Sequence, residues 1–316
     1  MQTTVQIQRP VKTKLSFSAK AKKTLRQMKE YRASYVFITP FLLLFITFTV
    51  IQVVLSIVLS FTYYNVLEFP RWAGWTNYRR LFVEDEVFMI AIKNTFVYAV
   101  ITGPLSYILC LLFAWIVNEL PGKLKAIMTF VFYAPSISNA FAIWTILFSG
   151  DMYGYANSFL LKWGIISEPI QWLTNTKYMM PIFIIVALWL SLGTSFLSMR
   201  AGFNTIDKQY FEAAAVDGIR NRWQELWYIT LPIMSPHLMF SAVLQITAAF
   251  SAGAVGNALF GFPSTNYATH TIMNHLSDYS GTRYERGYAA AIATLLFIAM
   301  VGTNKGVQKL IKKVGV

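Results

Sequence analysis

Charged residues are scarce in this sequence. Asp, Glu, Lys and Arg make up only 13% of its 316 residues, whereas a soluble domain usually carries about 25%. Hydrophobic residues make up 56%. A soluble core cannot use this much apolar surface, but a bilayer can. The composition therefore excludes an ordinary soluble domain and predicts one membrane domain of packed helices.

Acidic residues are fewer than basic residues, with 14 Asp and Glu against 27 Lys and Arg. The net charge of +13 is compatible with nucleic-acid binding by itself. The basic residues, however, cluster in short segments beside long apolar runs, which is typical of membrane topology and lipid headgroup contacts. We therefore expect membrane lipid as a partner and no nucleic acid.

Cysteine and phosphate-binding loops are also missing. The single cysteine, Cys110, lies in an apolar run, where it permits no internal disulfide and is best interpreted as a small apolar helix residue. No GxxxxGK[ST] loop occurs, and Gly302–Gly306 lacks the spacing to cradle phosphates. The sequence predicts no metal site and no cofactor on this chain, which we expect to be non-catalytic.

Six intervals without Asp, Glu, Lys or Arg define the architecture. A helix needs about 20 apolar residues to cross the hydrocarbon core. The intervals predict an all-α integral membrane protein with six transmembrane helices, at about 35–61, 90–117, 126–148, 179–201, 235–260 and 287–305. A six-helix membrane domain would thus occupy 35–305, between basic tails at 1–34 and 306–316.

The distribution of Lys and Arg predicts the orientation. With the N-terminus inside, the inside segments hold 19 of these residues and the outside segments hold eight. Both termini are therefore expected in the cytoplasm, and the longest cytoplasmic loop is expected at about 202–234.

Ionisable side chains are absent from the middle of every predicted span. An ion-coupled secondary transporter generally needs such a residue, and a membrane-bound enzyme needs a catalytic constellation at membrane depth. An ion-coupled transporter of a small solute remains the second hypothesis. The first is that energy enters from another subunit through contact.

Local signals in the 202–234 loop predict two short helices. Asn204 or Thr205 is a candidate cap for the first helix, and Gly218 suits a helix end in the left-handed conformation. Asn221, with Gln224 three residues on, begins the second helix as a partial capping box. Leu231-Pro232 is expected to end it and turn the chain back into the membrane.

The same loop carries a motif. Glu212-Ala213-Ala214-Ala215-Val216-Asp217-Gly218, followed by Ile229-Thr230-Leu231-Pro232, resembles the EAA loop of binding-protein-dependent ABC importer permeases. Ten residues separate Gly218 from Ile229, one more than the family pattern, which affects only the register of the second short helix. The resemblance implies the type I permease fold, and it implies that the loop docks through a coupling helix on a partner ATPase. The coupling residues would be Glu212, Ala213, Ala214, Asp217 and Gly218.

The resemblance extends along most of the chain. Gly74-Trp75-Thr76-Asn77-Tyr78 resembles a GxxNY box of the first permease of sugar importers. Tyr133-Ala134-Pro135, Tyr153-Gly154 with Asn157, and Gly287–Ala291 resemble later segments of that maltose-type branch. This likeness implies import of a sugar or oligosaccharide. It also implies four kinds of partner: a second homologous permease, two ATPase subunits that bind ATP and Mg, an extracytoplasmic solute-binding protein, and the bacterial inner membrane.

Two predicted spans contain side chains of the types that bind sugars, aromatic faces for C–H surfaces and amides or hydroxyls for OH groups. The candidates in span four are Trp189, Ser191 and Thr194, and those in span five are Gln245, Thr247 and Ser251. Packing between helices is the alternative for each of them. The three histidines, His237, His270 and His275, are interpreted as interfacial or loop residues rather than as ligands.

We expect the 202–234 loop to face the cytoplasm because of the bias in basic residues. In intact cells, a Gln209→Cys variant should resist an impermeant maleimide and react once the membrane is opened. A Lys162→Cys variant, which the same count places outside, is the positive control. Labelling of Gln209→Cys from outside intact cells would overturn this orientation.

Overall fold

The computed structural model describes residues 30–138 and 141–314, so most of the basic N-terminal tail lies outside the described residues. The chain divides into two units, Met1–Leu55 and Ser56–Val316. The described part of the first unit is helical and consists of α2 (Arg32–Phe45), the π-helical turn η1 (Ile46–Val50) and the start of α3 (Ile51–Leu59). These form one helix from Arg32 to Leu59 that is apolar enough to cross a membrane and buries none of its apolar stretch.

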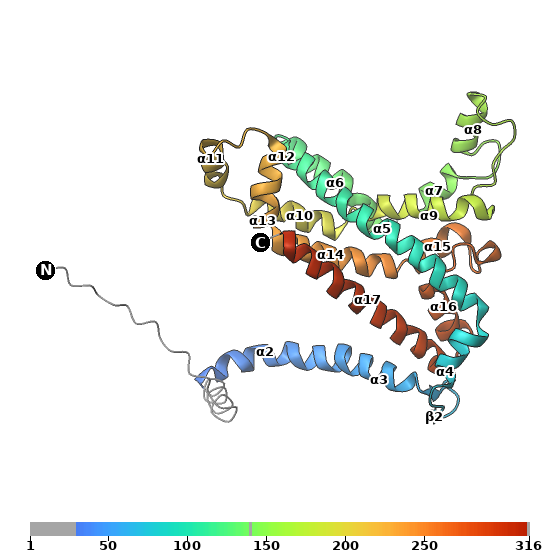
Figure 1. The fold of residues 1–316 in the computed structure, drawn as a ribbon. Coiled ribbons are helices and arrows are strands. Elements are labelled where there is room, and N and C mark those ends of the chain that lie inside the picture. The colour runs from blue at the N-terminus through green and yellow to red at the C-terminus, as the bar shows by residue number, and fades with distance from the viewer. Residues whose placement is uncertain (1–29, 139–140, 315–316) are drawn as a thin grey trace. The chain divides into compact units, whose positions relative to one another are not determined.

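The second unit is helical apart from one small hairpin (Figure 1). It begins with β1 (Thr62–Tyr63), β2 (Arg71–Trp72), α4 (Thr76–Arg79), η2 (Arg80–Glu84), α5 (Glu86–Glu119), α6 (Gly122–Ser138), α7 (Phe141–Leu147), α8 (Tyr155–Lys162), α9 (Thr176–Leu190) and α10 (Thr194–Asn204). It continues with α11 (Lys208–Val216), α12 (Arg222–Glu225), η3 (Leu226–Thr230), α13 (Leu231–Ile233), α14 (Ser235–Phe250), α15 (Gly253–Phe260), η4 (Thr265–Tyr267), α16 (Ile272–Ser277), η5 (Asp278–Thr282) and α17 (Arg286–Val314). The two strands pair antiparallel, with Thr62 opposite Trp72.

The all-α membrane architecture predicted from the sequence is confirmed. Among the described residues, four helices are long and apolar enough to span a membrane, and the number rises to six if two bent pairs each count as one span. One pair is α6 with α7. The other joins Arg222–Ile233 to α14 with a bend of 81°. The helix therefore does not end at Leu231-Pro232 as expected: Pro232 sits in the first turn of α13, where its missing N–H is tolerated, and the chain bends at Met234.

Helix α5 is the centre of the bundle and contacts α6, α9, α10, α14 and α16. Its buried residues recur every three or four positions from Phe88 to Val117, which places them on one face. Near its C-terminal end, that face joins a core that includes Cys110, Phe196 and Met234. The interpretation of Cys110 as a buried apolar residue agrees with this position.

A buried polar cluster joins the other end of α5 to α16 and α17. The carboxylate of Asp85 caps α5 by accepting a hydrogen bond from the amide N–H of Phe88, at 2.9 Å. Its second oxygen accepts from the Tyr288 hydroxyl at 2.6 Å and lies 3.0 Å from Nε2 of His275. On the far side, Nδ1 of His275 lies 3.2 Å from Nε2 of His270. One carboxylate thus connects three elements that are far apart in the sequence.

The electrostatics of this cluster depend on burial. Burial alone would raise the pKa of Asp85, but hydrogen bonds from His275, Tyr288 and the Phe88 amide outweigh it and hold the pKa well below its usual value. Burial, with a smaller contribution from the neighbouring His275, lowers the pKa of His270 to about 4. His270 and His275 expose only 3% and 2% of their surface. As expected, both histidines lie in the connection before α17, His270 in a loop and His275 in α16. The sequence did not predict their burial, because their partners Asp85 and Tyr288 are distant in the sequence.

We expect the cluster to make the fold acid-sensitive. Unfolded histidine takes up a proton near pH 6.5, whereas His270 resists protonation until about pH 4, with Asp85, His275, Asp278 and Arg283 as its charged neighbours. The free energy of unfolding therefore keeps its full contribution from His270 above pH 6.5. It decreases by up to about 3 kcal/mol as the pH falls from 6.5 toward 4.

Thermal unfolding of the purified protein at neutral pH and at about pH 5 measures this loss. A His270→Gln variant keeps an N–H donor toward His275 but cannot take up a proton, so its midpoint should fall less on acidification. His237→Gln, in α14, is the matched control and should behave like the wild type. Equal acid sensitivity in wild type and His270→Gln would contradict the assignment.

Candidate functional site

The loop between α10 and α14 presents a short, well-capped helix, α11. Its N-cap is Asp207, whose carboxylate accepts from the amide N–H of Gln209 at 3.1 Å. The expected caps are therefore wrong, because Asn204 still belongs to α10 and Thr205 ends it. Asp207 takes the role because it is the residue with extended backbone directly before the helix.

Gly218 ends α11 in the left-handed conformation, as predicted, with φ of +94°. The N–H of Ile219 donates to the carbonyl of Ala214 and the N–H of Gly218 to that of Ala215, which is the Schellman arrangement. A Cβ at Gly218 would meet no atom within 4 Å. The requirement for glycine is therefore one of backbone conformation and not of space.

Four of the five predicted coupling residues are exposed: Glu212, Ala213, Asp217 and Gly218. Ala214 is buried and fixes the inner face of α11. The loop continues into α12, where Asn221 accepts from the N–H of Gln224 as predicted, while the Gln224 side chain accepts from the N–H of Arg220. The EAA residues thus form an accessible surface at one end of the bundle (Figure 1).

Two contacts connect this loop to the C-terminal end of α5. The ring of Trp223 meets that of Trp115 edge to face, with centroids 4.7 Å apart. The guanidinium of Arg222 lies 3.5 Å from the carboxylate of Glu119. Because Arg222 and Glu119 are largely exposed, the ion pair contributes little on its own. The aromatic pair is the firmer link between the loop and α5.

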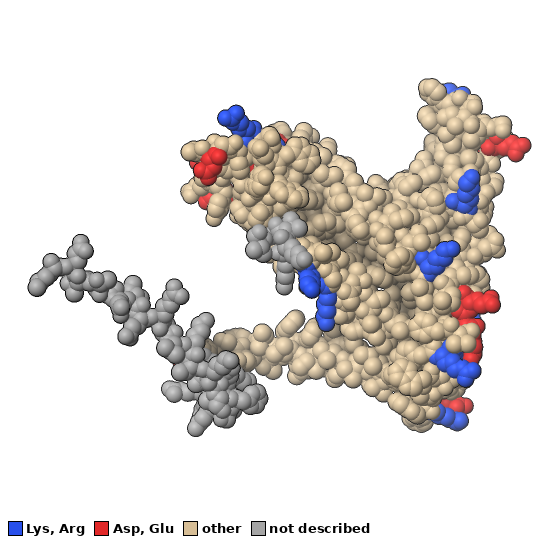
Figure 2. Space-filling model, viewed as in Figure 1, with Lys and Arg blue, Asp and Glu red and all other residues tan. Residues whose placement is uncertain are grey.

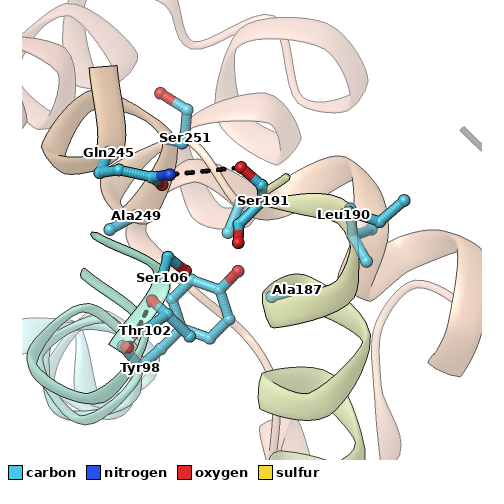
Figure 3. A pocket seen from close by; sticks show the side chains of 12 residues that line it. Tyr98, Thr102, Ser106, Ala187, Leu190, Ser191, Gln245, Ala249 and Ser251 are labelled. Atoms are coloured by element: carbon cyan, nitrogen blue, oxygen red, sulfur yellow. Dashed lines mark hydrogen bonds between the residues drawn. The ribbon is translucent and has the colours of Figure 1, made fainter. Parts of the chain in front are cut away.

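A cavity of about 250 Å³ lies between α5, α9, α14 and α15 (Figure 3). Hydroxyl and amide groups line part of it, and small apolar side chains line the rest. The lining residues are Tyr98, Thr102, Ser106, Ala187, Leu190, Ser191, Gln245, Ala248, Ala249, Ser251, Ala252 and Val255. In this described lining there is no charged side chain.

The cavity exists because two helical segments are interrupted beside it. α9 stops at Leu190, and the chain continues as α10 only at Thr194. The Ser191 carbonyl at this break accepts hydrogen bonds from the Gln245 amide at 3.2 Å and from the N–H of Gly193 at 2.8 Å. The second interruption, at Ser251 and Ala252, separates α14 from α15. Broken helices that line a cavity are typical of solute sites in membrane transporters.

The structure brings together three of the six residues predicted for a solute pathway: Ser191, Gln245 and Ser251. The other three are not among the cavity-lining residues. The ring of Trp189 packs edge to face on Trp144, with centroids 5.4 Å apart. Thr194 lines a separate, open hollow beside His237, and the exposed Thr247 donates its hydroxyl hydrogen to the carbonyl of Val243. The roles of all six stay predictions.

Sequence reasoning missed the polar face that α5 contributes. Tyr98, Thr102 and Ser106 are four residues apart, so their side chains lie on one helix face and are buried. The Tyr98 ring stacks on Phe183, with centroids 4.4 Å apart, and Figure 3 shows its hydroxyl directed toward Ser191. The signal in the sequence was the regular spacing of hydroxyl residues within a charge-free span.

The surface charges agree with a bundle that crosses a membrane. Figure 2 shows Lys, Arg, Asp and Glu side chains of the second unit at its two ends, with uncharged surface between them on the visible face. Among the described residues, no group of three His, Cys, Asp or Glu side chains could hold a metal ion. The polar cavity and the exposed loop are therefore the functional features that the geometry supports.

Comparison with known proteins decides the family. The model of the family described as "binding-protein-dependent transport system inner membrane component" matches residues 106–304, more than half of the chain. The chain belongs to this family. It is a multi-pass membrane protein and a permease subunit of the ABC transporter type, and the match does not support the ion-coupled alternative. The matched region contains most of the cavity and the whole EAA loop.

Several named relatives are similar over most of their length. The probable ABC transporter permease protein YesP of Bacillus subtilis is 34% identical, over 88% of this chain and 89% of the relative. The arabinooligosaccharides transport system permease protein AraP of Halalkalibacterium halodurans is 26% identical, over 84% and 83%. The lactose transport system permease protein LacF of Rhizobium radiobacter is 28% identical, over 66% and 70%.

The fold is also that of a solved transporter. A chain from the crystal structure of a bacterial ABC transporter involved in the import of the acidic polysaccharide alginate superposes with a TM-score of 0.74. The match covers 93% of this chain and all of the other, at 20% sequence identity. This likeness supports the type I permease fold implied by the EAA loop.

Proposed function

We propose that this permease forms, together with a second homologous permease, the translocation pathway for a sugar or oligosaccharide. The observation that carries the proposal is the uncharged cavity at the broken helices, lined by Tyr98, Thr102, Ser191 and Gln245. Hydroxyl and amide groups pair with sugar hydroxyls, and the Tyr98 ring offers an apolar surface to sugar C–H groups. The names of AraP and LacF, as transporters of sugars, support the same substrate class.

The remaining subunits follow from the chemistry that this chain lacks. An extracytoplasmic binding protein delivers the solute, and two separate ATPase subunits bind ATP and Mg²⁺. The permease itself catalyses no reaction and binds no cofactor. Both of its termini and the EAA loop face the cytoplasm, so that α11 docks on an ATPase and Glu212 contacts a basic group there. Glu212 is exposed and available for that contact.

Movement of the docked loop reaches the cavity through α5. The contact of Trp223 with Trp115 joins the loop to one end of α5, and Thr102 lies on the cavity-lining face of the same unbroken helix. Pro104 lies inside α5 between these two positions and removes one backbone hydrogen bond there, but the helix continues through it from Glu86 to Glu119. Closure of the ATPases would therefore shift the α5 hydroxyls relative to Ser191 and Gln245, and switch access to the solute.

A matched pair of threonines tests the pathway. Thr102 and Thr247 each donate a hydroxyl hydrogen to the carbonyl four residues earlier, at 2.8 Å, but only Thr102 lines the cavity. Thr102→Val should lower sugar uptake about tenfold, which corresponds to roughly one lost hydrogen bond. Thr247→Val should import at nearly the wild-type rate.

Uptake is measured in vesicles that contain the assembled importer, with lactose and arabinotriose as the first solutes. Tyr98→Phe, which keeps the stack on Phe183, is a second cavity variant and should also lower uptake. Basal ATP hydrolysis and subunit assembly should be unchanged in all three variants. Equal uptake by Thr102→Val, Tyr98→Phe and Thr247→Val would contradict the pathway.

The coupling role of the loop has its own test. Glu212→Ala removes the exposed carboxylate, and Gly218→Pro forbids the positive φ and removes an N–H at the helix end. Both variants should insert normally. The factor by which the binding protein increases the rate of ATP hydrolysis should fall about tenfold or more. Glu168→Ala, an exposed carboxylate in the loop between α8 and α9, is the control and should retain it. Wild-type stimulation in both loop variants would count against coupling through α11.

A further inference from the structure

Helix α8 presents an apolar stripe that nothing in the described chain covers. Tyr155, Phe159 and Trp163 are spaced by four residues and therefore share one face of the helix. They expose 68%, 58% and 69% of their surface. The rings of Phe159 and Trp163 contact each other, with centroids 5.8 Å apart. Exposed aromatic residues in this arrangement indicate an interaction surface.

The opposite face of α8 is held firmly by one buried amide. Asn157 is fully buried and donates from Nδ2 to the carbonyls of Ser149, Asp151 and Ile170. Its Oδ1 accepts from the N–H of Ile170 and from the indole N–H of Trp172, at 2.7 Å. The inner face is thus fixed to the segments on both sides of the helix. Because Asn157 fixes the opposite face of α8, the aromatic stripe points outward.

The surroundings of α8 favour lipid as the material that covers the stripe. Trp and Tyr concentrate where a membrane protein meets the headgroup region, and Trp172 and Tyr178 pack together at the start of α9, close in the chain to α8. The single charge on α8 is Lys162, on the flank of the stripe, where its ammonium can reach anionic headgroups.

A second exposed apolar element lies at the same end of the second unit. In the loop between β1 and β2, Leu67 and Phe69 expose 90% and 93% of their surface. Figure 1 shows this hairpin and α8 both at the end opposite α11, on different sides of the bundle. The headgroup region of a membrane surrounds the bundle and can contact both elements, whereas one docked protein would have to reach across the bundle.

We propose that α8 is an interfacial helix, whose Tyr155, Phe159 and Trp163 stripe lies in the headgroup region of the lipid leaflet on the side opposite the EAA loop. The helix then runs along the membrane surface, with Lys162 among the phosphates and Asn157 toward the protein. It anchors the segment between α7 and α9 at a fixed depth. The anchoring keeps the α9 break, and hence Ser191, level with Gln245.

Two neighbouring positions on α8 provide a matched experiment. Phe159→Cys lies in the stripe, and Ser158→Cys is exposed but turned about 100° from Phe159 around the helix. Each variant carries a nitroxide spin label in the complete importer, reconstituted in vesicles of phosphatidylcholine and phosphatidylglycerol. Cys110 is buried, and the unmodified protein gives its background labelling. Collisions with oxygen report lipid, and collisions with a water-soluble nickel chelate report solvent.

The ratio of oxygen to nickel accessibility should be at least threefold higher at position 159 than at position 158, with or without the binding protein. Trp163→Cys, a second stripe position, should follow Phe159→Cys. Equal high nickel accessibility at all three positions would overturn the proposal. So would shielding of position 159 from both reagents, which indicates the second permease, or shielding only after the binding protein is added, which indicates a docking site for that protein.

Discussion

The hydrogen bond from the Gln245 amide to the Ser191 carbonyl is the interaction on which the interior of this permease depends. Inside a bilayer there is no water to satisfy a backbone carbonyl that a broken helix releases. The break after α9 releases such a carbonyl, and Gln245 on α14 reaches it at 3.2 Å. The sulfur of Cys110, on α5, lies within hydrogen-bonding distance of the same amide. Three helices are therefore joined at the point where the cavity opens, and the Gln245 amide adds a donor to a carbonyl that also accepts from the N–H of Gly193.

The same helix, α5, is fixed at both of its ends by different chemistry. At its N-terminal end, the Asp85 carboxylate is held by His275 and Tyr288, which gives a buried and directional connection to α16 and α17. At its C-terminal end, Trp115 meets Trp223 of the EAA loop edge to face in a partly exposed contact. The N-terminal end of α5 is thus fixed to α16 and α17, and its C-terminal end contacts the EAA loop.

The sequence was sufficient for several features that depend on one segment, although it placed the N-cap of α11 at Asn204 or Thr205 and not at Asp207. Charge-free intervals predict the spans because the bilayer excludes charge, and Gly218 and Asn221 predict helix ends because caps are local. The packing at the Ser191 break and the burial of His270 and His275 involve neighbours that are distant in the sequence. The same limit applies to the cavity. Ser191 and Gln245 were selected by residue type, but Trp189 satisfied the same criterion and packs on Trp144 instead.

The length of α5 has a mechanical consequence. Its 34 residues extend about 51 Å at 1.5 Å per residue, whereas the hydrocarbon core is about 30 Å thick. Such a helix crosses the bilayer at a tilt or projects beyond it at both ends. Any change in its tilt alters how much apolar surface it offers to the acyl chains. The thickness of the surrounding membrane therefore contributes to the free energy of any change in the tilt of α5.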